Sequence, residues 1–319
     1  MKKKKQKDCD ICTFWQRAAA FAVDIGILVL LGMIIGAVFN DWLATTGAWG
    51  RLVGFAIAAV YFAIGDSELT GGKTPGKKIT GIKVVNILGE PINVLRCFMR
   101  ASVLLLPFFL YGIMLPPSAF ASAATVIITF VFLGVAAGLV YFYIFNHRTR
   151  QAFHDIAAGT YVAKAGSTGK VARDEHASRS VPVVHFIVFL AVLLVILSLS
   201  LLADYAMKKP FKEFGVSYDN VIRINSVIAD FDEVYYSYMD TGEGKIKGMD
   251  KKVRYLECFI YVYDRMVFTE ENAEKMAQII LSSYNDAQNL DIVFINFEYG
   301  FDIGIARDWE EISYPIEVK

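Results

Sequence analysis

Two ionisable residues lie in the first apolar segment of the chain, where they are the groups most able to do chemistry. Arg17 and Asp24 are seven residues apart in WQRAAAFAVDIGILVLLGMIIGAV. On a helix they would share one face, about two turns apart. An ionised group at membrane depth costs about 2.5–3.5 kcal/mol on insertion scales. Such groups therefore need a partner or a task, and the first question is what pairs with them.

The segment GGKTPGKK (71–78) has part of the pattern of a phosphate-binding loop. Gly71, Gly76 and Lys77 fit the spacing, but position 78 is Lys, so the hydroxyl that would hold Mg²⁺ is missing. The segment also follows an apolar helix instead of a buried strand. We therefore interpret it as a tight basic turn with anionic lipid headgroups as candidate partners. The residues of this turn are Gly72, Lys73, Thr74, Pro75, Gly76 and Lys77.

The rest of this loop contains alternating apolar residues before a helical stretch. Ile79, Ile82, Val84, Ile92 and Val94 predict either a short hairpin or a segment that lies at the lipid headgroups. The stretch that follows has helical character. Arg96 and Arg100 share one face of it because they are four residues apart.

A histidine next to an aspartate follows the fourth apolar run. His154 and Asp155 could relay protons at the membrane interface, or they could form a satisfied polar cluster that holds the local structure. His147 and His154 do not have a convincing metal spacing. Cys9 and Cys12 form one C-x-x-C, which leaves open a zinc ion shared between two chains or an ordinary reduced pair. We find no nucleophile–base pair and no cofactor loop, so we predict no enzyme, no cofactor and no metal.

Five apolar runs position these residues. They extend over about 17–39, 48–65, 98–116, 122–145 and 182–206, and each is long enough, or nearly so, to cross a hydrocarbon core of about 30 Å. Lys and Arg are concentrated before residue 17, in 66–97 and in 146–181, whereas 40–47 and 117–121 contain none. The positive-inside rule then predicts a cytoplasmic N-terminus and an external C-terminal region.

Charge divides the chain into two parts. Residues 1–206 hold 19 Lys/Arg against 11 Asp/Glu, and residues 207–319 hold 13 against 21. The second part contains strand-like segments at 233–239, 256–264, 291–300 and 301–309, an amphipathic helix at 269–287 and a further helix near 217–229. We predict an α+β domain with an antiparallel sheet and a turn around Gly300. Its acidic surface either binds a partner, a cation or a peptide, or only keeps the domain soluble.

In combination and order, these motifs resemble the RDD family of bacterial membrane proteins. The resemblance rests on Arg17, Asp24, GGKTPGKKITGIKVV (71–85), Arg100 and QAFHDIAAGTYV (151–162), and it covers about residues 13–163. The arginine and the two aspartates that name the family fall on Arg17, Asp24 and Asp155. For this family, cation/proton transport has been attributed to some members. We predict that Arg17 pairs with one or both carboxylates, with Arg100 as a further candidate.

The sequence thus predicts a membrane α-helical bundle, with four RDD-type helices and a fifth anchor helix, and a C-terminal α+β extracytoplasmic domain. The expected parts are a basic cytoplasmic N-terminus (1–16), the RDD-like transmembrane domain (17–163), a flexible cytoplasmic linker (164–181), the fifth helix (182–206) and the external domain (207–319).

The favoured function is a non-catalytic, multi-pass module of the bacterial cell membrane that displays an acidic binding or sensing domain. The alternative is a small cation/proton transporter that uses Asp24 and Arg17. The expected partners are the lipid bilayer and anionic lipids at the basic inner face, and no nucleic acid. Small-residue spacings at Gly32/Gly36 and Gly134/Gly138 permit close contact between helices, so the sequence is compatible with a homo-oligomer.

Overall fold

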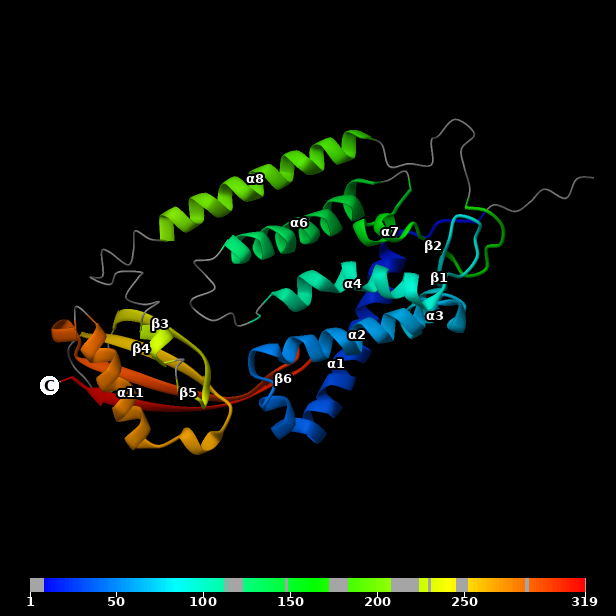
Figure 1. The fold of residues 1–319 in the computed structure, drawn as a ribbon. Helices are drawn as coiled ribbons and strands as arrows, with labels where there is room; N and C mark the ends of the chain where they lie inside the picture. Colours follow the sequence, from blue (N-terminus) through cyan, green and yellow to red (C-terminus); the bar gives the residue numbers. More distant parts are fainter. Residues whose placement is uncertain are drawn as a thin grey trace, which may run out of the picture. The chain divides into compact units, whose positions relative to one another are not determined.

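The protein forms two compact units in a computed structural model, and each unit is described by itself (Figure 1). The structure describes residues 9–111, 113, 123–146, 149–171, 183–207, 224–228, 231–244, 252–284 and 287–318. Unit 1 comprises 1–34, 52–112 and 129–197, and unit 2 comprises 35–51, 113–128 and 198–319.

Unit 1 is built from apolar helices that lie wholly or mainly within it. They are α1 (Phe14–Ala44), α2 (Gly50–Gly65), α4 (Val94–Leu110), α6 (Ala123–Phe145) and α8 (Val183–Met207). In the part of the chain that the structure describes, the helical stretches Phe14–Ala44 and Gly47–Gly65 are long and apolar enough to cross a membrane, and Phe130–Phe145 and Val183–Leu199 are apolar but shorter. The second stretch includes the short helix η1 (Gly47–Trp49).

The apolar side chains of these helices are exposed in large numbers. Leu30, Met33 and Ile34 on α1 are each at least 60% exposed, and α8 also exposes many apolar side chains, such as Val183 and Ile187. A continuous exposed apolar face is unusual for a helix in water, but it is what a lipid environment requires. The run that we predicted at 98–116 begins earlier, at Val94, and its residues 114–116 lie outside the described part of the chain.

Short elements connect these helices at one end of unit 1. They are η2 (Glu68–Thr70), α3 (Pro75–Thr80), β1 (Ile82–Val85), α7 (Phe153–Ala158) and β2 (Tyr161–Lys164). β1 pairs antiparallel with β2, with Ile82 opposite Lys164. The predicted hairpin between Ile82/Val84 and Ile92/Val94 is therefore wrong. Ile92 instead forms an isolated bridge with Ser67, because the turn at Asn86–Glu90 leads the chain to the start of α4 and not back along β1.

The segment 166–169, which we expected in a flexible linker, is held against this small sheet. Lys83 Nζ donates to the carbonyl of Ser167 at 3.0 Å, and the backbone N–H of Val171 donates to Ile87 at 3.1 Å. Val171 is buried. Residues up to 171 therefore pack within unit 1, and residues 172–181 lie outside the described part of the chain.

Unit 2 contains a four-stranded sheet and one long helix. The strands are β3 (Val234–Gly244), β4 (Val253–Val262), β5 (Ile292–Asp302) and β6 (Arg307–Glu317), in the order β3-β4-β5-β6, and α11 (Glu270–Ser283) connects β4 to β5. The predicted β-β-α-β-β order is confirmed. Of the predicted helix near 217–229, residues 224–228 are helical and 217–223 lie outside the described residues.

The prediction of an antiparallel sheet is wrong at its centre. β3–β4 and β5–β6 are antiparallel, but β4 and β5 are parallel. The reason is the connection: a helix the length of α11 can return the chain to the edge where β4 began, which a hairpin cannot do. One face of the sheet packs on α11, where Met276 and Ile280 join Leu256, Ile260 and Ile295 in the core.

The predicted turn around Gly300 is also wrong. β5 continues through Gly300 to Asp302, and β6 begins at Arg307. Gly300 lies opposite Trp309 with φ +150°, and a Cβ on it would lie 2.0 Å from the carbonyl oxygen of Asp308. Glycine is needed here for a close strand approach and not for a reversal of the chain.

Unit 2 also includes the turn between α1 and α2. Ala44 is buried in the core of the unit. Arg51 Nη2 lies 2.7 Å from Asp302 Oδ2, and Asn40 Nδ2 donates to Asp308 Oδ2 at 3.1 Å. The 40–47 turn and the C-terminal strands thus belong to one packed body.

Candidate functional site

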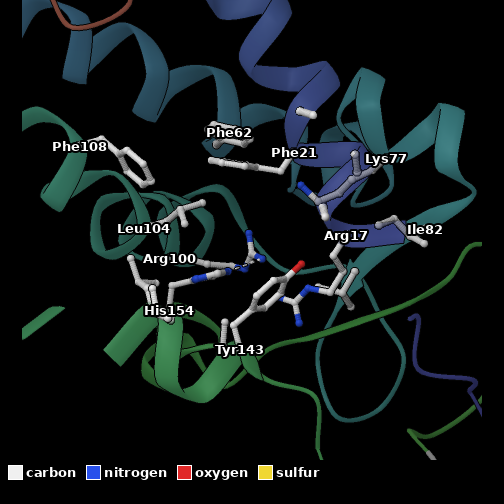
Figure 2. A pocket seen from close by; sticks show the side chains of 17 residues that line it. Arg17, Phe21, Phe62, Lys77, Ile82, Arg100, Leu104, Phe108, Tyr143 and His154 are labelled. Carbon is white, nitrogen blue, oxygen red and sulfur yellow. Dashed lines mark hydrogen bonds between the residues drawn. The ribbon is translucent and has the colours of Figure 1, made fainter. Parts of the chain in front are cut away.

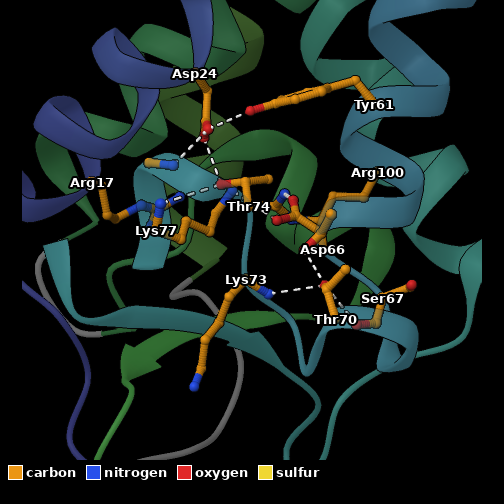
Figure 3. A network of polar contacts seen from close by, with 12 residues as sticks. Arg17, Asp24, Tyr61, Asp66, Ser67, Thr70, Lys73, Thr74, Lys77 and Arg100 are labelled. Carbon is orange, nitrogen blue, oxygen red and sulfur yellow. Dashed lines mark hydrogen bonds and ion pairs between the residues drawn. The ribbon is translucent and has the colours of Figure 1, made fainter. Parts of the chain in front are cut away.

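A cavity of about 330 Å³ in unit 1 brings together four of the residues that we singled out in the sequence (Figure 2). Arg17, Lys77, Arg100 and His154 line it, together with apolar side chains from α1, α4 and α6. Three cations around one cavity in a helical membrane domain need counter-charges close by. The polar contacts behind the cavity wall supply them (Figure 3).

Asp24 is fully buried, but neutral groups and not Arg17 surround its carboxylate. Tyr61 Oη donates to Oδ1 at 2.8 Å, Thr74 Oγ1 donates to Oδ2 at 2.6 Å, and the backbone N–H of Gly76 donates to Oδ1 at 2.9 Å. The described residues show no Arg17–Asp24 ion pair, so this half of the predicted pairing is not found. Three donors satisfy most of the acceptor capacity of a carboxylate and offset its loss of water.

The basic turn 71–78 has the residues that it needs to reach Asp24. Thr74 is the N-cap of α3 and accepts from the N–H of Lys77 at 3.3 Å, and Pro75 occupies the start of this short helix. A Cβ on Gly76 would lie 2.2 Å from the carbonyl oxygen of Ala20 in α1. Only glycine therefore lets α3 approach α1 closely enough for the Gly76–Asp24 hydrogen bond.

The other residues of the turn hold it on β1 and η2. Gly72 has φ +75°, and a Cβ there would lie 2.3 Å from the carbonyl oxygen of Val84. The N–H of Lys73 donates to Thr70 Oγ1 at 3.4 Å. A phosphate-binding loop directs its N–H groups at a ligand, whereas the N–H of Gly76 is already occupied by Asp24.

Five buried side chains form a continuous chain of ion pairs from α1 to α3. Arg17 binds Asp155 and also donates to the carbonyl of Arg150. Arg100 Nε donates to Asp155 Oδ1 at 2.9 Å, and Arg100 Nη1 donates to Asp66 Oδ2 at 2.6 Å. Lys77 Nζ lies 2.7 Å from Asp66 Oδ1. The predicted Arg17–Asp155 pair is present, and Arg100 takes part as the further candidate.

Together with Asp24, this ion network contains three cations and three carboxylates. Its members come from α1, the end of α2, α3, α4 and α7, so it connects five segments of the chain. A buried ion pair contributes little net free energy, but the loss of one partner typically costs 3–5 kcal/mol because a charge is left uncompensated. The network therefore specifies how these five segments pack.

Asp66 is the member that our reading of the sequence missed. It is 1% exposed and sits directly after α2. An acidic residue at the C-terminal end of a helix is disfavoured by the helix dipole. Asp66 could therefore have been found from the sequence, because an acid directly after a long apolar run needs a cation as its partner.

α7 is fixed to α4 by both arginines that share a face of that helix. Arg96 Nε donates to the carbonyl of Ala158 at 2.6 Å, and Arg96 Nη2 donates to Gly159 at 2.9 Å. These are carbonyls at the C-terminal end of α7, where a cation is favoured. Arg100 binds Asp155 one turn earlier. The prediction that Arg96 and Arg100 act from one face is confirmed.

His154 is buried beside this network and is neutral. Its Nε2 lies 3.1 Å from Arg100 Nη2, and because a guanidinium can only donate, Nε2 accepts and Nδ1 carries the proton. Burial lowers the pKa of His154 to about 3, although Asp155 opposes the shift. Burial alone would raise the pKa of Asp155, but Arg17 and Arg100 hold it well below its usual range. This pair is poorly suited to relay protons near neutral pH.

The two N-terminal cysteines do not form a joint site. Both are buried, and they lie in separate apolar clusters, with Cys9 Sγ 3.1 Å from Ser167 Oγ. Burial raises the pKa of Cys12 to about 11, so its thiol stays protonated. Within the described ranges, no group of three or more His, Cys, Asp or Glu is placed to hold a metal ion.

Unit 2 has a cluster of aromatic and acidic side chains on the sheet face opposite α11. Aromatic rings follow one another across the strands: Tyr238 stacks on Phe259 at 4.6 Å between centroids, and Tyr261 contacts Trp309 at 5.2 Å. Glu298 lies between Tyr261 and Glu311 in the strand register. Burial, with Glu311 as a second cause, raises the pKa of Glu298 to about 7.

The first unit is thus a helical membrane domain whose charged residues meet at a short basic turn. Residues 11–159 match the model of a family described as the RDD family. No curated protein and no solved structure matches the chain. The match confirms the resemblance to the RDD family that the motifs predicted, and the sheet of unit 2 lies outside the matched range.

The close contact between α3 and α1 gives a first prediction. Gly76→Ala should force α3 away from Ala20 and break the hydrogen bond to Asp24, with a loss of about 1–3 kcal/mol, typical of overpacking. The measurement is the free energy of unfolding or the melting temperature of the full chain in detergent. Gly26→Ala is the matched control, because nothing lies within 4 Å of a Cβ at that exposed position of α1. Equal stability of the two variants would contradict the close contact.

The raised pKa of Glu298 gives a second prediction. The folded state holds the proton of Glu298 more tightly than the unfolded state, so this residue should lower stability as pH rises from about 4.5 to about 7. Glu298→Gln should melt close to the wild type at pH below 4.5 and above it at pH 8. Thermal unfolding of the full chain across this pH range measures the effect. Glu317→Gln, an exposed change at the end of β6, should show no such pH-dependent difference.

Proposed function

We propose that the protein is a non-catalytic membrane module, in which the RDD-family domain is a rigid base and the C-terminal domain of unit 2 is a binding domain. One observation carries this proposal: each acid of the ion network is buried and already has protein groups as partners, either hydrogen-bond donors or cations. Asp24 has three neutral donors, and Asp66 and Asp155 have buried cations.

This arrangement argues against cation transport as the main role. A transporting carboxylate must exchange its partner for an ion or a proton during the cycle. Asp24, Asp66 and Asp155 are each at most 1% exposed. The adjacent cavity is lined by Arg17, Lys77 and Arg100, whose charges repel a cation. A packing role needs none of these groups to move.

For the membrane arrangement, we propose five crossings with a cytoplasmic N-terminus and an external C-terminal domain. The distribution of Lys and Arg supports this arrangement, because the segment before α1 is rich in lysine whereas the turn 40–47 contains no Lys or Arg. This turn packs in the same unit as the C-terminal strands, which fits a common location outside a bacterial cell membrane.

The aromatic face of the sheet is the best candidate for binding. Aromatic side chains are enriched in protein interfaces because they bury a large area at a low cost in side-chain entropy. Tyr238, Phe259, Tyr261 and Trp309 are all partly exposed on this face. Glu257 and Glu298 lie among them in the strand register, so a partner with basic groups would complement its charge.

The test of a packing role against transport is Asp24→Asn. In vesicles that contain the full chain, we expect no proton-coupled Na⁺ or K⁺ exchange above that of empty vesicles, for the wild type or the variant. The variant should also be less stable by about 1–3 kcal/mol, because one buried hydrogen bond loses its acceptor. Measurements are a pH-sensitive dye inside the vesicles and the melting temperature in detergent.

Asp41→Asn is the matched control on the same helix. The Asp41 side chain is exposed, and its contact with Arg265 spans 3.3 Å at the surface, so this change should leave stability almost unaltered. Exchange in the wild type that disappears in a fully folded Asp24→Asn protein would overturn the packing role and support transport.

A further inference from the structure

The cavity of unit 1 has a charged end and an apolar end. Arg17, Lys77 and Arg100 supply the charged end, with His154 beside them. Apolar side chains line the rest of the cavity, among them Phe21, Ala22, Leu104, Phe108, Leu139 and Val140, and the ring of Phe62 lies 5.5 Å from Lys77 Nζ. Figure 2 shows the rings of Phe21 and Phe62 across from Tyr143 and Arg17. A volume of about 330 Å³ is within the range of small-ligand sites.

The charged end has hydrogen-bond donors left over. Arg17 and Lys77 have more N–H donors than their contacts with Asp155, Arg150 and Asp66 require. Nδ1 of His154 is buried without a hydrogen-bond partner among the described residues. Because Nε2 accepts from Arg100, this nitrogen is a donor. A buried donor without an acceptor is costly, and an anionic group would satisfy it.

The lining carries no acid that could receive a cation. Asp24, Asp66 and Asp155 lie behind the wall, and the described residues that line the cavity include no Asp or Glu. The site therefore complements a net negative group and offers nothing to the ammonium of a zwitterion. Its cations are held in place by the ion network, so an anion meets donors that are already oriented.

The apolar end opens where lipid chains would be. Val140 and Phe108 line the cavity and are 60% and 55% exposed, on the helices α6 and α4. A hydrocarbon chain could enter between these helices without crossing a polar barrier. Arg17 is in the first turn of α1, so the charged end lies near the membrane surface, at the depth of lipid headgroups.

We propose that this cavity binds one anionic phospholipid of the bilayer, with the headgroup phosphate on Arg17, Lys77 and His154 and one acyl chain along Phe21, Leu104 and Val140. The second acyl chain stays in the surrounding bilayer. The bound lipid joins α1, α4 and α6 on the side of the cavity that the ion network does not reach.

The experiment measures lipid binding to the full chain in an uncharged detergent by native mass spectrometry. The probes are phosphatidylglycerol and phosphatidylcholine with the same acyl chains, oleate, and inorganic phosphate. The same lipids are then titrated at about 1 M NaCl, and the rise in melting temperature is measured. At this salt concentration the Debye length is about 3 Å, which suppresses binding to exposed lysines. We expect one phosphatidylglycerol to bind at least about tenfold more tightly than phosphatidylcholine, a difference of about 1.4 kcal/mol.

Two substitutions fill the apolar end and leave the ion network intact. Val140→Trp on α6 and Ala22→Trp on α1 replace cavity-lining residues, and each should weaken phosphatidylglycerol binding at least about tenfold. Val131→Trp is the matched control, because Val131 is an exposed valine of the same helix α6 outside the lining. It should bind as the wild type does. If one of the two filling variants does not fold, the other still tests whether the lipid binds in the cavity.

Other outcomes overturn the proposal. Equal binding of the two phospholipids would mean that the cations do not select a headgroup. Unchanged binding in both folded filling variants would place the lipid elsewhere. Binding of oleate without phosphatidylglycerol would identify a fatty-acid site, and competition by inorganic phosphate alone would identify a free-anion site.

Discussion

The need to give every buried charge a partner, charged or neutral, is the constraint on which the helical domain of unit 1 depends. Three cations and three carboxylates are taken out of water together, and none can lose its partners without a large cost. Arg17 on α1 and Lys77 on α3 lie at the two ends of one ion-pair chain through Asp155, Arg100 and Asp66. A bundle of apolar helices has little in its packing to select one arrangement, because lipid contacts are as apolar as helix contacts. The ion network provides that selection.

The same constraint explains the irregular elements at this end of the bundle. α3 is only six residues long, yet its cap residue Thr74 and its Gly76 carry two of the three hydrogen bonds to Asp24. β1 and β2 join the loop that contains α3 to the segment that contains α7. α3 and α7 therefore bring partners to charges on the long helices, and the β1–β2 pair holds their two loops together. The cavity beside them follows from this, since the acids stay behind the wall and the cations face inward.

The sequence carried enough information for part of this site. The resemblance to the RDD family singled out Arg17 and Asp155, and their opposite charges then indicated that they pair, with Arg100 as a further candidate. The partners of Asp24 were not predictable in the same way, since Tyr61, Thr74 and a backbone N–H carry no charge signal. Pairing of β1 with β2 escaped prediction because the partner is far along the chain, whereas both alternatives that the alternating pattern left open, a hairpin and a segment at the headgroups, were local. In unit 2 the order of strands and helix along the chain followed from composition, but the parallel pairing of β4 with β5 depended on where α11 returns the chain.

The separation in sequence between the partners of the ion network has a consequence for biosynthesis. Asp24 receives its donor Thr74 only after 50 further residues have been made, and Arg17 receives Asp155 only after 138. A growing chain therefore brings α1 to the membrane with both charges unmatched: Asp24 stays so until α2 and α3 have emerged, and Arg17 until α4, α6 and α7 have. The first helix cannot reach its final environment by itself. It must wait near the surface or in the protected space of the insertion machinery until the last partner arrives, which makes assembly of this domain a late event that depends on the whole of it.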